Sequence, residues 1–238
     1  MTQKLIAAFP KKGGTFQIEP DASSGSYFWA ATQIQKHAFQ FNNGIIVKNW
    51  PASGWQIDEG FPKFLDLPTV VSRSKDLGDS ILTAFVLAPF SQNPVKFTDL
   101  ERIRVQESDR LDTMFEGLQH TGSIVLSGTL VAPTENIQGF KSYVSPSDNS
   151  LIVNPHISSK ADQPIDPRND HRIAMCFAIL GLKVPGIRIK NPSCVKKTFP
   201  NFFQKLAAPP PHGLGAEIWE VKTGQRTRQL SGDDLFAD

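Results

Sequence analysis

Basic side chains gather at three places in this 238-residue chain, and at two of them acidic residues stand beside them. The segments are RIRVQESDR at 102–110, NDHR at 169–172 and KKT at 196–198. Apolar spacing places Arg110, Arg172 and Lys197 at the starts of predicted helices, where the helix dipole disfavours a cation unless an anion shares the site. Three such cations would bind a polyanionic small molecule. The simpler interpretation of the first segment is a solvated ion pair between Glu107 and Arg110, and of the lysines, solubility.

Carboxylates accompany these cations. Asp79 and Glu107 would lie beside a bound anion, where carboxylic acids can transfer protons. Asp21, Asp79 and Asp170 each precede a predicted helix, and an aspartate there can instead act as a simple N-cap. Both interpretations stay open on the sequence.

Helices and short strands must position these residues. Apolar residues at i, i+3, i+4 and i+7 predict helices, and short runs of β-branched residues between Gly, Pro or Asn predict strands. The expected helices cover 27–38, 80–88, 111–118, 173–182 and 199–206, with a weaker one near 61–67. The expected strands are 45–47, 95–97, 124–131, 151–153 and 187–189.

The order of these elements repeats. A helix, a strand, a polar link and a second helix follow Asp21, Asp79 and Asp170 in turn. Three copies of one supersecondary unit are therefore predicted, in a pseudo-symmetric α/β globule. If the copies pack around a pseudo-threefold axis, the three cations can converge.

Composition excludes several classes of protein. A net charge of +2, with 39% hydrophobic and 20% charged residues, fits a globular protein and argues against disorder or nucleic-acid binding. No stretch is long enough to span a membrane, and Met1–Ala8 is too short for a secretory signal. Cys176 and Cys194 are expected to be reduced thiols in the cytoplasm. The scattered histidines and the lack of phosphate-binding glycine motifs predict neither a metal nor a nucleotide cofactor.

The composition changes after Leu206. Residues 207–213 (AAPPPHG) predict a polyproline-like linker, and residues 214–238 are polar. They either add a strand at 217–221 or form a loose tail. We therefore expect one domain over 1–207 and a Pro-rich linker with a polar tail over 208–238.

Four blocks resemble the 5-enolpyruvylshikimate-3-phosphate synthase family. They are DASSGSYFWAA at 21–31, IRVQESDRL at 103–111, NDHRIAMCFAILGL at 169–182 and NPSCVKKTFPNFFQKL at 191–206. The likeness covers roughly 12–207 and is to the C-terminal domain. It implies an inside-out barrel of three βαβαββ units, with buried helices and outer sheets. The implied reaction joins the enolpyruvyl group of phosphoenolpyruvate to the 5-hydroxyl of shikimate 3-phosphate and releases phosphate, with no metal or cofactor.

The resemblance also implies roles for individual residues. Asp79 would bind the shikimate hydroxyls and accept a proton, and Glu107 would exchange a proton with the phosphoenolpyruvate methylene group. Arg110, Arg172 and Lys197 would hold the phosphate and carboxylate of phosphoenolpyruvate.

The chain departs from the family pattern in three ways. Gln106 stands where the family has lysine, so it would contact shikimate 3-phosphate without a charge, and Arg102 is a candidate to replace that charge. The motifs of the other half of the enzyme are absent, which implies a complementary N-terminal chain or self-association. The strand that the N-terminus contributes in the family is also absent, and 217–221 is a candidate to fill its place.

Other functions remain open at this stage. A non-catalytic anion-binding or interaction module on the same fold is the main alternative. Two relatives that share the fold are UDP-N-acetylglucosamine enolpyruvyl transferase and RNA 3′-phosphate cyclase, although the DHR and KKTFP blocks fit the shikimate branch better.

Overall fold

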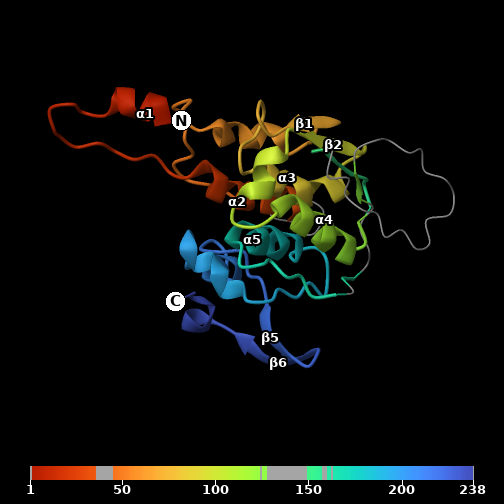
Figure 1. The fold of residues 1–238 in the computed structure, drawn as a ribbon. Coiled ribbons are helices and arrows are strands. Elements are labelled where there is room, and N and C mark those ends of the chain that lie inside the picture. The colour runs from red at the N-terminus through yellow and green to blue at the C-terminus, as the bar shows by residue number, and fades with distance from the viewer. Residues whose placement is uncertain are drawn as a thin grey trace. The chain divides into compact units, whose positions relative to one another are not determined.

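The computed structural model describes residues 2–35, 45–123, 125–127, 149–156, 160–161 and 163–237. The chain forms two compact units, and Figure 1 labels its main helices and strands. The first comprises residues 1–100 and 126–155, and the second comprises residues 101–125 and 156–238. The mixed α/β class predicted from the sequence is confirmed.

Helices make up much of the first unit. They are α1 (Thr2–Ala8), α2 (Ala22–Gln35), the 3₁₀ helix η1 (Ile57–Phe64), α3 (Ile81–Leu87) and the 3₁₀ helix η2 (Ala88–Phe90). Asp21 begins α2 as predicted, because its Oδ1 accepts the Ser23 N–H at 2.9 Å. A hydrogen bond of 2.8 Å between the buried hydroxyls of Ser26 and Thr83 joins α2 to α3. Every residue of α3 is buried, as its apolar sequence predicts.

A four-stranded sheet completes the first unit. Its strands are β1 (Val70–Ser72), β2 (Val95–Thr98), β3 (Val125–Ser127), where the two units divide, and β4 (Leu151–Val153), in the order β1-β2-β4-β3. β2 lies parallel to β1 and antiparallel to β4. The rings of Phe85 and Phe97 meet edge to face at 4.5 Å, so α3 packs on the sheet.

The second unit is mainly helical. It contains the 3₁₀ helix η3 (Glu101–Val105), α4 (Arg110–His120), α5 (His171–Leu180), the 3₁₀ helix η4 (Pro192–Lys197) and α6 (Phe202–Ala207). The apolar residues that predicted α4 and α5 are all buried. The two helices approach closely, because a Cβ at Gly117 would lie only 2.2 Å from Cζ of Phe177. Their N-terminal ends carry the charged residues considered below.

An antiparallel hairpin follows α6. It consists of β5 (Ile218–Lys222) and β6 (Gln225–Leu230), and the 3₁₀ helix η5 (Gly232–Leu235) comes after it. The Ala237 N–H donates to the Pro200 carbonyl at 2.9 Å, and Gln204 Nε2 donates to the Gly232 carbonyl at 2.9 Å. The strand predicted at 217–221 is therefore confirmed as β5, and the loose tail is wrong. Its pairing is with β6 in a separate two-stranded sheet, so it does not complete the larger sheet.

Several predicted elements differ from the structure. Residues 45–47 form no strand, and 187–189 contribute only one bridge, between Ile165 and Ile189. Of the strand predicted at 124–131, only 125–127 lie among the described residues, and Ala38 lies outside them. The weak helix near 61–67 is the 3₁₀ helix η1, which ends at Phe64. From β1 to β4 the chain has the order βαβαββ, with α3 and α4 as its helices. The threefold repetition of that unit stays a prediction.

Candidate anion and proton-transfer site

The start of α4 carries the first predicted cation. Asp109 caps the helix, because its Oδ1 accepts the Asp112 N–H at 3.0 Å, and its Oδ2 pairs with Arg104 at 3.1 Å. Arg110 is therefore the first helical residue, as the apolar spacing predicted. The ion pair between Glu107 and Arg110 is present at 3.7 Å. It is not solvated as that interpretation assumed, because Arg110 is only 2% exposed.

A buried carboxylate compensates the charge of Arg110. Its Nε donates to Asp170 Oδ2 at 2.6 Å, and its Nη1 donates to Gln106 Oε1 at 2.7 Å. The carboxylate of Asp170 thus offsets the unfavourable position of this cation at the positive end of the α4 dipole. Gln106 suits this arrangement because its amide oxygen accepts a hydrogen bond, whereas a lysine has no acceptor.

Asp170 links the two helices. Its side chain is fully buried, and its Oδ1 accepts the Arg172 N–H at 2.9 Å, so it caps α5 as predicted. Its Oδ2 also accepts from Ser108 Oγ at 3.2 Å. One carboxylate therefore begins α5 and holds the guanidinium of α4.

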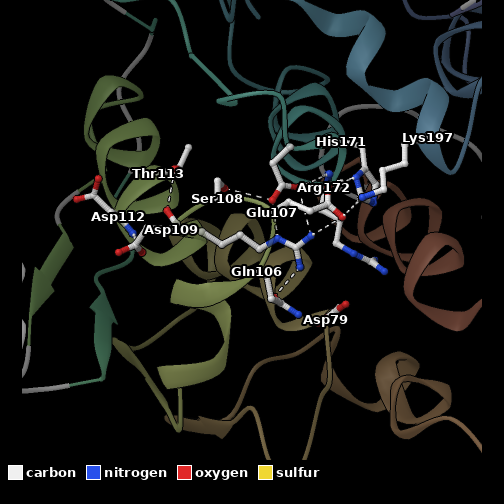
Figure 2. Close-up of polar contacts among 12 residues, drawn as sticks. Asp79, Gln106, Glu107, Ser108, Asp109, Asp112, Thr113, His171, Arg172 and Lys197 are labelled. Carbon is white, nitrogen blue, oxygen red and sulfur yellow. Dashed lines mark hydrogen bonds and ion pairs between the residues drawn. The ribbon is translucent and has the colours of Figure 1, made fainter. Parts of the chain in front are cut away.

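Glu107 makes three polar contacts (Figure 2). Its Oε2 lies 2.8 Å from His171 Nδ1, and its Oε1 lies 2.7 Å from Lys197 Nζ and 3.7 Å from Arg110 Nη2. Residues from the start of α4, from α5 and from η4 thus meet at one carboxylate, which remains partly exposed.

His171 contacts Glu107 as a neutral imidazole. Burial lowers the pKa of His171, and Arg172 lowers it further, while Glu107 and Asp170 partly oppose the shift. Because a carboxylate accepts hydrogen bonds, Nδ1 carries the proton and donates it to Glu107. Its Nε2 is buried and has no hydrogen-bond partner among the described residues.

The cluster has the residue types of a metal site but not its charge. One ligand atom from each of Glu107, Asp170 and His171 lies within 4.8 Å of the others. The guanidinium of Arg110 and the ammonium of Lys197 already contact the two carboxylates. A divalent cation would be repelled by both of these charges.

The net charge favours an anion. Arg110, Arg172 and Lys197 lie with two carboxylates and a neutral histidine in the same unit. Three cations against two carboxylates leave a net positive charge, and Lys197 is 59% exposed. The arrangement can therefore attract an anionic ligand and present Glu107 to it for proton exchange.

The predicted position of Lys197 is wrong. It is the last residue of η4, whereas α6 begins only at Phe202, so Lys197 does not begin a helix. It reaches the cluster through Glu107 instead. Cys194 lies in the same 3₁₀ helix, and burial together with Asp170 and Glu107 raises the pKa of its thiol to about 11. The thiol is therefore protonated at neutral pH.

Asp79 belongs to the first unit. Its Oδ1 accepts from Arg73 Nη2 at 3.1 Å. The N-cap interpretation of Asp79 is wrong, because Ser80 occupies the cap position of α3. The carboxylate that bonds the N-terminal end of α3 belongs to Asp58, from η1.

Sequence reasoning missed three residues of these networks. It identified Asp170 only as a cap, included His171 only within the segment NDHR, and did not select Asp58. The DHR block held a signal for the first two, because it places ionisable groups at a helix start. Asp58 stands among polar and apolar residues with no distinctive spacing. Arg102 is an exposed residue of η3, and its compensation for Gln106 stays a prediction.

No helix within the described part of the chain combines the length and apolar character needed to cross a membrane.

Comparison with known proteins supports the resemblance. Residues 71–206 match the family model described as EPSP synthase (3-phosphoshikimate 1-carboxyvinyltransferase). The chain is 35% identical over 205 residues to the 3-phosphoshikimate 1-carboxyvinyltransferase of Pseudomonas syringae pv. syringae, which covers 85% of this chain and 44% of that protein. It is 34% identical to the enzyme of the same name from Rhizobium etli, over 83% of this chain and 43% of that protein.

A solved EPSP synthase from Acinetobacter baumannii matches with a TM-score of 0.41 and 26% identity, over 63% of this chain and 28% of that one. The chain spans less than half the length of the curated relatives given above.

Proposed function

Because the chain belongs to the EPSP synthase family, we propose that it supplies the C-terminal half of a shikimate-pathway enolpyruvyl transferase. The 5-hydroxyl of shikimate 3-phosphate adds to C2 of phosphoenolpyruvate, and the methylene carbon of phosphoenolpyruvate gains a proton. A proton then leaves the resulting methyl group of the tetrahedral intermediate as phosphate departs, which regenerates the enol ether. This reaction requires two proton-transfer groups and a binding site for anions.

The carrying observation is the position of Glu107. Its carboxylate contacts the neutral imidazole of His171 and the ammonium of Lys197, and it lies beside the buried Arg110. Glu107 would exchange the proton at the methylene carbon, since a partly exposed carboxylate with defined partners is oriented for such transfer. Arg110, Arg172 and Lys197 would bind the phosphate and carboxylate of phosphoenolpyruvate.

The other substrate would involve two further residues. Asp79 would accept the proton of the attacking hydroxyl, and its ion pair with Arg73 would orient the carboxylate for that task. Gln106 would bind shikimate 3-phosphate through its amide while its oxygen accepts from Arg110. We propose no metal or organic cofactor for this chemistry.

We extend the proposal to the architecture. Residues 1–207 would form a domain of three βαβαββ units as an inside-out barrel, and residues 208–238 an appended segment. The observed order from β1 to β4 supports one such unit. Closure over substrates would need a complementary N-terminal chain or a second copy of this chain, because enzymes of this kind exclude water when two domains shut. The expected location is the cytoplasm.

Phosphate release tests the proposal. The chain is mixed with an N-terminal half from a relative and supplied with both substrates, and inorganic phosphate is measured. We expect turnover by the mixture and little by either half. Glu107→Gln should lower kcat by about 10²–10⁴-fold, since proton transfer contributes this much. Glu116→Gln removes an exposed carboxylate from α4 and serves as the matched control. Equal rates for the two variants would contradict the role of Glu107.

A non-catalytic anion-binding module is the second candidate. Gln106 favours it, because the family's cationic side chain is replaced by a neutral one that bonds Arg110. Calorimetry separates the two functions. Binding of phosphoenolpyruvate without turnover in the mixture would support the module, and turnover would reject it.

A further inference from the structure

Asp58 is a buried carboxylate that accepts hydrogen bonds from two other segments of the first unit. It lies in η1 and is only 4% exposed. Its oxygens accept from Ser23 Oγ at 2.5 Å, Gly78 N at 2.5 Å, Ser80 N at 3.2 Å and Ser80 Oγ at 2.6 Å. All four donors are neutral groups from the start of α2 and the start of α3. Such a carboxylate fixes the backbone that surrounds it.

Two of these donors flank Asp79. The N–H groups of Gly78 and Ser80 lie one residue before and one residue after it, and both point at Asp58. Ser80 does not cap α3 with its own hydroxyl, because that hydroxyl donates to Asp58 instead. The backbone at Asp79 is thus held on both sides by one side chain.

The packing at Gly78 leaves little room for movement. A Cβ at this position would lie 2.9 Å from Ile57 Cγ2 and 3.1 Å from Asp58 Oδ1. A side chain at position 78 would therefore force Ile57 or Asp58 of η1 to shift. Contact with Asp58 and its neighbour Ile57 thus fixes the position of the chain just before α3.

Arg73 contacts the carboxylate of Asp79, whereas Asp58 holds the backbone on either side of Asp79. Its Nη2 lies 3.1 Å from Asp79 Oδ1, and the side chains of Arg73 and Asp79 are 13% and 24% exposed. This pair forms only if the backbone at Asp79 presents the carboxylate to Arg73. Its strength is therefore a measure of the position of Asp79.

We infer that Asp58 is the positioning residue for Asp79, acting through the N–H groups of Gly78 and Ser80. This inference rests on the proposed role of Asp79 as the proton acceptor. Loss of the Asp58 charge would release the turn before α3 and let the Asp79 carboxylate move, so Asp58 would act only through the backbone that it holds.

A thermodynamic cycle tests the inference without requiring activity. Urea unfolding of the full chain is followed by tryptophan fluorescence in a Trp219→Phe background, so that the signal comes from Trp29, Trp50 and Trp55 of the first unit. The coupling between Arg73→Ala and Asp79→Ala is measured with Asp58 present and again in an Asp58→Asn background. We expect about a threefold coupling in the unfolding equilibrium constant when Asp58 is present, and none in the Asp58→Asn background.

Ser26→Ala is the matched control. It removes a buried hydroxyl between α2 and α3, near the same helices, but leaves residues 78–80 untouched. We expect the coupling to survive in this variant. Should Asp58→Asn fail to fold, Ser80→Ala takes its place, because it removes one of the four donors, and a reduced coupling is expected. Unchanged coupling without the Asp58 interaction, or equal loss in Ser26→Ala, would overturn the inference.

A kinetic measurement connects the inference to the reaction. In the reconstituted phosphate-release assay, Asp58→Asn should lower kcat by about tenfold or more while the KM for phosphoenolpyruvate changes less than about twofold. Ser26→Ala should retain the wild-type kcat. Inactivity of the wild-type mixture would reject the proposed function and leave the cycle intact, whereas a normal kcat in Asp58→Asn would reject the positioning role alone.

Discussion

Arg110 and Asp170 form the most deeply buried ion pair described in the second unit. The two charges are 60 residues apart in sequence and 2.6 Å apart in space. Burying both removes their hydration, so each becomes strongly unfavourable without the other. The pair thus links the start of α4 to the start of α5 before any ligand binds.

Removing the cation of this pair should be costly. We expect Arg110→Ala to lower the free energy of unfolding by about 3–5 kcal/mol, because Asp170 would remain buried and uncompensated. Urea unfolding followed by Trp219 fluorescence, in a background where Trp29, Trp50 and Trp55 are replaced by Phe, measures the change. Arg168→Ala removes a cation that is 40% exposed and should cost less than about 1 kcal/mol. Similar losses in the two variants would contradict this account of Arg110.

The lowered pKa of His171 predicts a pH dependence of stability. The unfolded histidine titrates near 6.5 and the folded one at lower pH, so the unfolded state binds more protons in between. We expect the contribution of His171 to the free energy of unfolding to be complete above about pH 6.5 and to be lost as the pH falls toward the folded pKa. Glu107, Asp170 and Arg172 also act on this ring.

Urea unfolding between about pH 5 and pH 7.5 measures the effect. His171→Gln should remove this part of the pH dependence, while His212→Gln, at an exposed position, should leave it in place. An identical pH profile for wild type and His171→Gln would show that His171 does not cause the change.

At the scale of elements, the contact between α4 and α5 decides the geometry of the cluster. Gly117→Ala would drive a methyl group into the buried ring of Phe177, since the new Cβ would lie 2.2 Å from Cζ. We expect the free energy of unfolding to fall by about 1–3 kcal/mol. Gly60→Ala, where nothing lies within 4 Å of the new Cβ, should change it by less than about 1 kcal/mol. Chemical denaturation of both variants checks this, and a neutral Gly117→Ala would mean that the helices can separate freely.

The long helices could be predicted because burial imposes a 3.6-residue period on α2, α4 and α5. α6 is shorter than predicted because Phe199 precedes Pro200, and the residue before a proline avoids helical geometry. Residues 45–47 and 187–189 have strand-like composition, but 45–47 form no strand and 187–189 pair only with Ile165 among the described residues. β6 is polar and was not predicted, since it exists only by pairing with β5 across the Thr223–Gly224 turn.

The candidate site was predictable in part. Cations next to acids at helix starts identified Arg110 and Arg172, because the helix dipole makes them anomalous. The partners could not be predicted, since Asp170 and Arg110 meet only through tertiary packing. Asp58 is a similar case, because its donors at 23, 78 and 80 come from distant segments.

At the scale of the whole molecule, the charged cluster lies entirely within the second unit, and Asp79 lies within the first. Each unit has its own buried core. A variant that weakens one unit can therefore be distinguished from a variant that weakens the other.

The C-terminal hairpin should stabilise the second unit alone. Deleting residues 217–238 removes the buried Leu235 and Ala237 and the bonds to Pro200 and Gln204. We expect a loss of about 1–3 kcal/mol, seen as faster amide hydrogen exchange in α6, with exchange in α2 unchanged. Unaltered exchange in α6 would show that the segment after 216 is dispensable.

Arg168 holds the segment before α5 to α4 through Asp112 and Glu116, at 2.7 and 2.8 Å, and all three side chains are substantially exposed. Exposed charges are screened when the Debye length shrinks to about 3 Å at 1 M ionic strength, whereas the buried guanidinium of Arg110 is shielded from dissolved ions. Added potassium chloride should therefore loosen this outer attachment while the inner one persists. Any dependence of ligand affinity on electrolyte concentration would then combine screening of the anion itself with a gradual release of the chain that leads into Asp170.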